Sequence, residues 1–340
     1  MTGTSQNGSQ PIKPLFSVII LCWNSDRYLR ACLDALDKQT CKDFEIILVD
    51  NGSPEPVSTA SFVNFPTLPI RLFKLDHNLG FAGGNNSAAS QARGDYLALL
   101  NADAFPTPGW LEAISKAIPN YPVSFFASKL IMANQPDRLD GVGDIYHASG
   151  LAWRSAYNYP LSMVADLEKE VFSACAAAAV YPKDAYNRAY GFDPDYFSYV
   201  EDVDLGFRLR LLGYKCIYLP DANVRHVGSG STGKRSDLSV YHGTRNLIWT
   251  FYKDMPGFLV VALTPLHLLA EFMLLMLGVI RKQGLITLKA QWDAFASLPV
   301  IFKKRKTIQS SRKVSIFTIM KSIDWDPFSP LTKLLHNDHD

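Results

Sequence analysis

Long apolar runs alternate with helical patterns through the first third of the chain. Four segments have the continuous apolar character of buried strands: 16–23, 44–50, 70–75 and 95–103. Three segments have apolar residues at helical spacing: 26–39, 87–94 and 110–118. A Gly/Asn loop at 77–86 precedes the second of these helices. The alternation predicts a parallel sheet with helices on both faces, with ligands at the carboxyl ends of its strands near Trp23, Asp50, Asn78 and Asp103.

The middle of the chain has shorter apolar segments, whose order in the sheet its pattern does not give. Strands are predicted over 125–132, 145–150 and 171–181, and a helix over 183–190. A further helix follows Asp204, and a short strand ends at His226. The Gly/Ser-rich segment 228–234 then reads either as a linker or as a lid over a bound substrate, and its place just after His226 favours the lid.

Past Tyr241 the pattern predicts helices only. Residues 258–280 are apolar for long enough to cross a bilayer, which needs about 20 residues. Thr264, His267 and Glu271 form a polar stripe that would be costly inside lipid. We therefore expect an amphipathic helix in the membrane plane, with the stripe in water and the apolar face in lipid. A true span and a soluble packing helix are the alternatives, and another helix is expected over 284–302.

Composition and charge refine this picture. The 340 residues have 48% hydrophobic content, which suits a globular core, and five scattered cysteines without a CxxC pair suit buried thiols in a reducing cytosol. The polar N-terminus, residues 1–14, has no apolar signal-peptide core and is expected to be a disordered leader. The net charge of +2 divides into +9 for residues 272–323 and −7 for the rest. The basic part is thus directed toward an anionic surface, which we expect to be a membrane and not a nucleic acid.

One acidic segment points to catalysis. Glu201, Asp202 and Asp204 fall within four positions, and such closely spaced carboxylates need a cation, an arginine or a transferable proton to compensate them. Asp103 ends an apolar run about a hundred residues upstream, and His226 ends the run downstream. Asp103, Asp202 and His226 can converge on one cleft, as two metal ligands and a base.

The order of the motifs resembles the inverting family 2 glycosyltransferases of GT-A fold, in particular the bacterial rhamnosyltransferase-like branch. The matching stretches are SVIILCWNSDRYLRACLDALDKQTCKDFEIILVDNGS, NLGFAGGNN, GDYLALLNAD, GFDPDYFSYVEDVDLGFRLRLLGY and His226, continuing through YHGTRNLIWTFYK and the basic tail. The resemblance covers nearly the whole chain. It implies a GT-A fold: a Rossmann-like mixed sheet with helices on both faces, followed here by amphipathic C-terminal helices.

The resemblance also implies the roles of the acidic residues. Asp202, the second residue of the Glu-Asp pair, is the expected catalytic base. Asp103 and His226 are the expected ligands of Mg²⁺ or Mn²⁺, although Asn101-Ala102-Asp103 replaces a full DxD-type triplet and leaves one anionic ligand. For His226 the alternative is a strand-end histidine bonded to backbone. Asp204 and Arg208 are expected near the acceptor, and the alternative is that Asp204 caps the following helix or pairs with Arg208. Glu201 can orient the acceptor sugar.

Donor binding is expected along the strand ends. Asp50 resembles the carboxylate that accepts an N–H of a pyrimidine base, with a turn-forming role as its alternative. Glycines in the Gly/Asn loop would allow the backbone to approach the nucleotide closely. The full set of expected donor-binding residues is Cys22, Asn24, Asp50, Asn78, Gly83, Gly84, Asn85, Asn101 and Ala102.

The resemblance therefore implies an inverting transferase that moves a sugar, rhamnose or another hexose, from a dTDP- or UDP-sugar to a lipid-linked or polysaccharide acceptor in cell-surface glycan synthesis. The predicted domains are a GT-A domain at 15–240 and a helical, basic, membrane-associating region at 241–340. The expected location is the cytoplasmic face of the inner (plasma) membrane, peripheral or monotopic. A sugar nucleotidyltransferase and a non-catalytic GT-A-like membrane scaffold are the alternatives.

Overall fold

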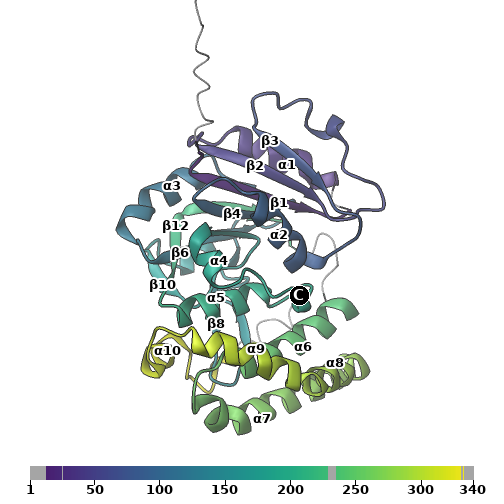
Figure 1. The fold of residues 1–340 in the computed structure, drawn as a ribbon, viewed down its shortest axis with the longest axis vertical. Coiled ribbons are helices and arrows are strands. Elements are labelled where there is room, and N and C mark those ends of the chain that lie inside the picture. The colour runs from purple at the N-terminus through teal and green to yellow at the C-terminus, as the bar shows by residue number, and fades with distance from the viewer. Residues whose placement is uncertain (1–12, 25, 229–234, 331, 333–340) are drawn as a thin grey trace, which may run out of the picture.

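The computed structural model describes residues 13–24, 26–228, 235–330 and 332, and it places a twisted sheet at one end and a layer of helices at the other (Figure 1). The segment 229–234, for which a lid is predicted, and most of the predicted leader lie outside the described residues.

The main sheet is mixed, in the strand order β10-β12-β6-β11-β4-β1-β2-β3. Its strands are β1 (Phe16–Cys22), β2 (Phe44–Asp50), β3 (Ile70–Lys74), β4 (Tyr96–Asn101), β6 (Ser124–Met132), β10 (Lys169–Val171), β11 (Ala178–Pro182) and β12 (Lys215–His226). Strands β1 to β4 run parallel, as their buried apolar runs predict, and β11 is antiparallel to β4. Short strands β5 (Ala104–Pro106) and β7 (Leu139–Gly141) extend the sheet, and β8 (Asp144–Tyr146) pairs with β9 (Ala152–Arg154) separately.

The helices that precede β12 cover both faces of this sheet and form the body of the molecule with it (Figure 1). They are α1 (Asp26–Asp37), α2 (Gly80–Gln91), α3 (Trp110–Ala117), α4 (Lys183–Arg188) and α5 (Glu201–Leu211). Side chains alternate between the faces, so that Val18 and Ile20 join one buried cluster and Ile19 joins the other. The predicted α/β architecture with a mixed sheet is confirmed.

Two local predictions in this body are wrong. The Gly/Asn segment expected to be a loop is the first half of helix α2, because its small residues let the helix approach the sheet: a Cβ at Gly84 would lie 2.5 Å from the Leu21 side chain. The single strand expected over 171–181 is two strands, β10 and β11. Between them the backbone turns away to bond with Asp144 through Phe172 and Ser173.

The regular elements of the C-terminal layer are helices in its described residues, as expected, and Asp324 adds a single β-bridge to His147. It contains α6 (Asp237–Asp254), α7 (Leu259–Ile280), α8 (Gly284–Ala296), α9 (Leu298–Ser310) and α10 (Ile316–Ser322). One helix was expected over 284–302, but the chain breaks at Ser297. Pro299 lies in the first turn of α9, the helical position where the missing N–H of proline costs least.

The polar stripe of α7 faces the protein and not water, which corrects the sequence expectation. His267 is fully buried; its Nδ1 lies 2.8 Å from the Ser149 carbonyl oxygen and its ring stacks on Phe251. Glu271 accepts a hydrogen bond from Gln291 of α8. The apolar side of α7 is the exposed side, with Val261 74% and Ile280 78% exposed.

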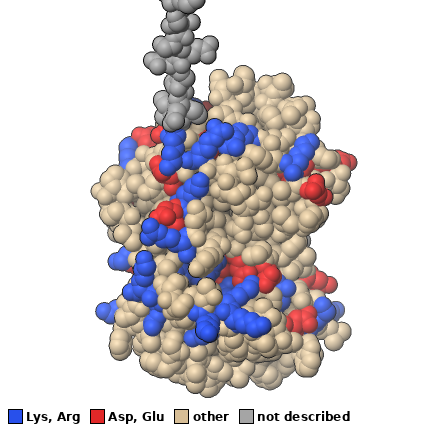
Figure 2. Space-filling model, in the orientation of Figure 1, with Lys and Arg blue, Asp and Glu red and all other residues tan. Residues whose placement is uncertain are grey.

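Charge is distributed unevenly over the surface. In the orientation of Figure 1, Lys and Arg side chains spread across the lower half of the molecule around a group of acidic side chains (Figure 2). Below them the surface is mostly uncharged, at the end where Figure 1 places α7.

Candidate active site

Asp202 lies in the first turn of α5, and backbone N–H groups hold its carboxylate. Its Oδ2 accepts from Ala176 N at 3.0 Å and its Oδ1 from Val203 N at 2.9 Å. Burial raises the pKa of Asp202, although these N–H groups and Arg154 favour its charged form. An oriented carboxylate with a raised pKa is suited to accept a proton.

A second group of polar side chains forms where β4 ends and β12 ends. Antiparallel pairing of β5 with β12 sets Ala104 opposite His226, which brings the histidine to the turn after β4. His226 Nε2 lies 3.4 Å from Asp103 Oδ1 and 3.5 Å from Asn101 Nδ2. The predicted convergence of Asp103 and His226 is therefore present.

Asp140 and Arg154 support this group from behind. Asp140 Oδ2 lies 2.7 Å from His226 Nδ1 and 2.5 Å from Arg154 Nη1. Although burial opposes its charge, Arg154 and His226 hold the pKa of Asp140 at about 2. An anionic Asp140 fixes the His226 ring with Nδ1–H donating to it, which directs Nε2 toward Asp103. Burial lowers the pKa of His226, but Asp103 and Asp140 together raise it.

The backbone connects the two groups. Asn101 N donates to the Ala177 carbonyl at 2.9 Å. The preceding residue, Ala176, donates its N–H to Asp202. Arg154 also interacts electrostatically with both Asp202 and His226. The end of β4 and the start of α5 therefore border one site.

The arrangement of Asp103 and His226 fits a hard divalent cation. An oxygen and a nitrogen 3.4 Å apart can share one metal ion at about 2.0–2.3 Å from each. Magnesium commonly takes one or two protein ligands and completes its shell with water and substrate phosphate. Across the described part of the chain no cluster of three or more His, Cys, Asp or Glu side chains is ready to hold a metal, so substrate oxygens would supply the remaining ligands.

Asp144 is a second buried carboxyl in this region. Its Oδ2 accepts from Ser173 Oγ at 2.7 Å. Burial and the charge of Asp202 raise the pKa of Asp144, whereas Arg154 lowers it.

Asp50 has the turn geometry that was its alternative role. Its Oδ1 accepts from Ser53 N and its Oδ2 from Val57 N. The neighbouring Asn51 instead reaches the start of α2, where its Nδ2 donates to Asn78 Oδ1 at 3.0 Å and to the Gly80 carbonyl. Asp50 thus shapes the turn at the strand end, and donor binding by Asp50 and Asn78 stays a prediction.

The other expected donor residues surround the same strand ends. Cys22 is buried opposite Asp50 in the β1–β2 register, and Asn24 is exposed with positive φ. Asn85 is buried and donates to Phe81 O of its own helix, and Ala102 is buried in the turn before Asp103. Gly83 and Gly84 face protein: a Cβ at Gly83 would meet Leu79, as one at Gly84 would meet Leu21. Close packing therefore requires glycine at Gly84, and donor binding by these residues stays a prediction.

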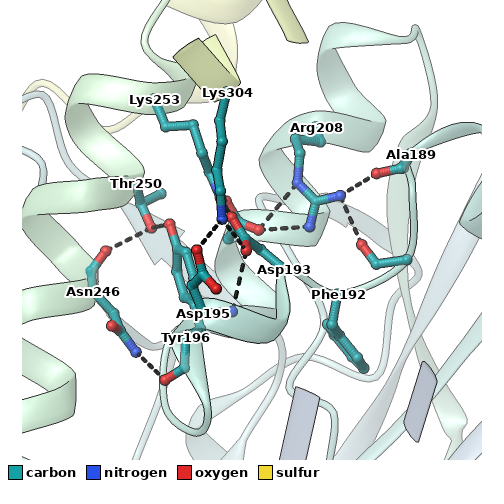
Figure 3. Close-up of polar contacts among 12 residues, drawn as sticks. Ala189, Phe192, Asp193, Asp195, Tyr196, Arg208, Asn246, Thr250, Lys253 and Lys304 are labelled. Atoms are coloured by element: carbon teal, nitrogen blue, oxygen red, sulfur yellow. Dashed lines mark hydrogen bonds and ion pairs between the residues drawn. The ribbon is translucent and has the colours of Figure 1, made fainter. Parts of the chain in front are cut away.

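Asp204 and Arg208 belong to a buried charge network (Figure 3 labels Arg208, Lys253 and Asp193 of it). Arg208 Nη2 pairs with Asp204 Oδ2 at 2.5 Å, which bears out the pairing alternative for Asp204. Lys253 of α6, fully buried, pairs with both Asp204 and Asp193. Lys304 of α9 pairs with Asp193 and Asp195.

Glu201 lies beside Asp202, and burial raises its pKa well above the ordinary value. Its Oε2 is buried without a hydrogen-bond partner among the described residues. An acceptor role for Glu201 stays a prediction.

Comparison with known proteins supplies the family. The sequence model of "Glycosyl transferase family 2" matches residues 17–188, half of the chain. The chain belongs to glycosyl transferase family 2. A similar curated protein is N-acetylglucosaminyl-diphospho-decaprenol L-rhamnosyltransferase of Mycobacterium tuberculosis, 26% identical over 258 residues, covering 66% of this chain and 80% of that protein. The O-antigen biosynthesis protein RfbC of Myxococcus xanthus is 26% identical over 234 residues, covering 66% of this chain and 18% of that protein.

Solved structures of similar shape place the glycosyltransferase in the GT-A fold. The mannosyltransferase PcManGT of Pyrobaculum calidifontis, solved with GDP-Man and Mn²⁺, aligns with TM-score 0.55 and 18% identity over 93% of this chain and 88% of that chain. GalNAc-T7, solved with UDP, GalNAc and Mn²⁺, aligns with TM-score 0.58 and 13% identity over 72% of this chain and 48% of that chain. The family membership decides against the nucleotidyltransferase alternative.

Several residues of this glycosyltransferase's site were missed by sequence reasoning. Asp140, Asp144 and Arg154 come from short segments without a clear periodic pattern. Asn51 adjoins a predicted residue. Lys253, which pairs with Asp204 outside the site, lies on a helix assigned to the membrane region. The acid-rich stretch around Asp140 was the available signal, and it names no partner.

Proposed function

We propose that this glycosyltransferase moves a sugar from a nucleotide-diphosphate donor to a lipid-linked acceptor with inversion at the anomeric carbon. The observation that carries the proposal is the backbone bridge at 176–177, which joins Asp202 to the end of β4 two residues before Asp103. A proton acceptor and a site for a diphosphate are thereby side by side.

Asp202 is the proposed base. It takes the proton of the acceptor hydroxyl as that oxygen attacks the anomeric carbon and the nucleotide diphosphate departs from the opposite face. Asp103 and His226 would hold Mg²⁺ or Mn²⁺, which when bound compensates the charge of the leaving diphosphate. Asp140 orients His226 for this task. Asn101 and the strand ends near Cys22, Asp50 and Asn78 would line the donor.

Rhamnose is the proposed sugar, from a dTDP or UDP donor. Support comes from the similarity to a protein named as an L-rhamnosyltransferase that acts on N-acetylglucosaminyl-diphospho-decaprenol. By the same similarity, the acceptor is a sugar linked through a diphosphate to a polyprenol.

Residues 258–313 are proposed to dock on the cytoplasmic face of a membrane without crossing it. Helix α7 is long and apolar enough to cross a bilayer by length and composition. Its buried polar stripe ties it to α6, α8 and Ser149, which favours docking in the membrane plane. Exposed apolar residues continue from α7 onto α8, where Leu285 and Trp292 are 86% and 74% exposed. A monotopic surface of this kind would bring a polyprenol-linked acceptor to the enzyme.

The basic tail contributes less than its sequence predicts. Lys304 pairs with Asp193 and Asp195, and Arg305 donates to the Tyr252 and Met255 carbonyls. These two cations pair inside the protein, so not all of the positive charge of residues 272–323 is free to face an anionic surface. Between residues 303 and 321 the exposed cations are Lys303, Lys306, Lys313 and Lys321.

A donor panel tests the proposed function. Purified protein is incubated with dTDP-, UDP- and GDP-sugars, with and without Mn²⁺, and both thermal stability and release of the nucleotide diphosphate are measured. A matching donor at a hundred times its dissociation constant adds about 2.7 kcal/mol of stability. We expect the strongest response with a dTDP- or UDP-deoxyhexose plus Mn²⁺, and transfer to a polyprenyl-diphosphate-GlcNAc analogue. No turnover with any donor would favour the scaffold alternative.

A further inference from the structure

The chain that leads into the base helix has an unusual backbone. Phe197, Tyr199 and Val200 have φ of 63°, 71° and 68°, the left-handed region that non-glycine residues avoid and β-branched residues avoid most. Val200 is the residue immediately before α5, so Glu201 and Asp202 follow it directly. Surrounding contacts must hold such a backbone in place.

One buried side chain of α6 contacts three carbonyl groups of this segment. Asn246 Nδ2 lies 3.0 Å from Tyr196 O, 3.1 Å from Ser198 O and 2.7 Å from Tyr199 O (Figure 3 shows the first of these). Arg245 Nε donates to Asn246 Oδ1 at 3.0 Å, which fixes the amide with its NH₂ toward the carbonyls. Asn246 is completely buried.

Other contacts hold the segment between α6 and the helix next to the donor site. Ala82 N, in the first turn of α2, donates to Phe197 O at 3.1 Å. Tyr196 Oη lies 2.9 Å from Thr250 Oγ1 of α6, and the His242 ring stacks on Phe197. Helices α2 and α6 therefore both contact the 196–200 segment.

We propose that Asn246 is a positioning residue for sugar transfer, which holds the 196–200 segment in its left-handed conformation and thereby places Asp202. The inference rests on the proposed role of Asp202 as base. Helix α6 lies outside the 17–188 family match, so the catalytic unit extends into the C-terminal helices. A displacement of about 1 Å at a catalytic group can lower turnover by about 10²-fold, so a backbone held at three carbonyls has catalytic weight.

The test compares Asn246→Ala with Gln291→Ala. Gln291 is also a buried amide of the C-terminal helices, but it donates to Glu271, away from the 196–200 segment. In Asn246→Ala, hydrogen exchange of the 196–204 backbone should rise by about ten-fold or more while the sheet is unchanged. In Gln291→Ala, faster exchange should be confined to α7 and α8. With the best donor of the panel, kcat should fall about 10–100-fold in Asn246→Ala at nearly constant donor KM, and should hold in Gln291→Ala.

A second substitution separates positioning from loss of packing. Glycine adopts positive φ without strain, so Val200→Gly in the Asn246→Ala background should recover kcat by roughly five-fold. Absence of recovery, or a kcat loss matched by Gln291→Ala, would overturn the proposal. Hydrogen exchange needs no substrate: unchanged exchange over 196–204 overturns the positioning role even if transfer is confirmed. Wild-type protein without turnover on any donor overturns the proposed function instead.

Discussion

At the residue scale, the position of Asp202 determines what its replacement should do. Backbone N–H groups of Ala176 and Val203 hold both oxygens, and an asparagine can keep one of these bonds through its carbonyl oxygen. We expect Asp202→Asn to retain the fold and donor affinity but to lower turnover roughly 10²–10⁴-fold, the usual contribution of a general base. Steady-state kinetics with donor-binding titration checks this, and near-normal turnover would contradict the assignment.

Asp140 provides a test of the metal site that needs no acceptor. Because its charge orients His226, Asp140→Asn should weaken Mn²⁺ binding to the enzyme–UDP complex by roughly 10–100-fold. Isothermal titration of Mn²⁺ measures the change, and Asp137→Asn is the control because Asp137 is an exposed acid in the turn just before β7. Equal Mn²⁺ affinity in both variants would show that His226 is not a ligand.

Which site residues the sequence could predict follows from how they are placed. Asp103 lies in the turn between β4 and β5, Asp202 in the first turn of α5 and His226 at the end of β12, so the pattern of elements locates them. Asp140 and Arg154 reach the site through short strands, β7 and β9, whose pairing depends on contacts distant in the sequence. Asn246 acts on carbonyl groups fifty residues away, and no local pattern encodes such a contact.

At the scale of elements, periodicity predicted where strands and helices lie better than it predicted what each element packs against. The stripe Thr264, His267 and Glu271 was recognised, but whether its partner was water or protein depended on α8, which supplies Gln291. Helix α2 shows the same limit. Its glycines suggest a loop, whereas the small size of Gly84 allows the close contact with Leu21.

The buried Glu271 should make stability depend on pH. Burial raises its pKa from 4.5 to about 7, so the folded state binds more protons than the unfolded state between these values. The contribution of Glu271 to stability should therefore fall as pH rises from 4.5 through 7, by roughly 3 kcal/mol at most. Burial lowers the pKa of His267, one turn earlier on α7, from 6.5 to about 4, so between these values the unfolded state binds more protons at this group and its contribution rises with pH. Wild type and Glu271→Gln share the His267 contribution, so the difference between them isolates Glu271.

Replacing the acid should remove this dependence. We expect Glu271→Gln to melt several degrees above wild type at pH 8 and to lose that advantage near pH 5, because the amide carries no charge at either pH. Thermal melts across this range measure it. Asp34→Asn, which removes an exposed carboxylate of α1, is the charge-matched control. Parallel melting curves for Glu271→Gln and wild type would show that Glu271 is not protonated in the fold.

At the scale of the whole molecule, buried charges join the C-terminal helices to the catalytic body. Lys253 of α6 lies between Asp193 and Asp204, and Lys304 of α9 reaches Asp193 and Asp195 (Figure 3). Removing one member of the fully buried Lys253–Asp204 pair costs about 3–5 kcal/mol, so α6 stabilises the body that it covers. The Lys304 pairs are partly exposed and contribute less. The division of the chain at residue 240 stays a prediction, and these contacts cross it.

This arrangement leads to a salt-dependent prediction for membrane binding. The exposed apolar face of α7 and α8 should give binding that resists salt, and each exposed tail lysine should add about 1 kcal/mol that salt removes. Replacing Lys303, Lys306, Lys313 and Lys321 by glutamine should release much of the protein from anionic vesicles at low salt. Phe272→Asp, which charges the centre of the apolar face, should remove the salt-resistant part.

Lys304→Gln supplies the matched control, because Lys304 neighbours Lys303 in sequence but pairs internally with Asp193 and Asp195. Lys304→Gln should lower the melting temperature and leave vesicle affinity nearly unchanged. Lys303→Gln should lower vesicle affinity and leave the melting temperature nearly unchanged. Cosedimentation with anionic and neutral vesicles across a salt series gives both components. Wild-type protein that stays in the supernatant with anionic vesicles at low salt would contradict membrane docking. A C-terminal tag on the protein gives the topology. If external protease leaves the tag intact on whole cells and cleaves it only after the membrane is opened, the protein docks from the cytoplasmic face. Cleavage of the tag on whole cells would indicate that α7 crosses the bilayer.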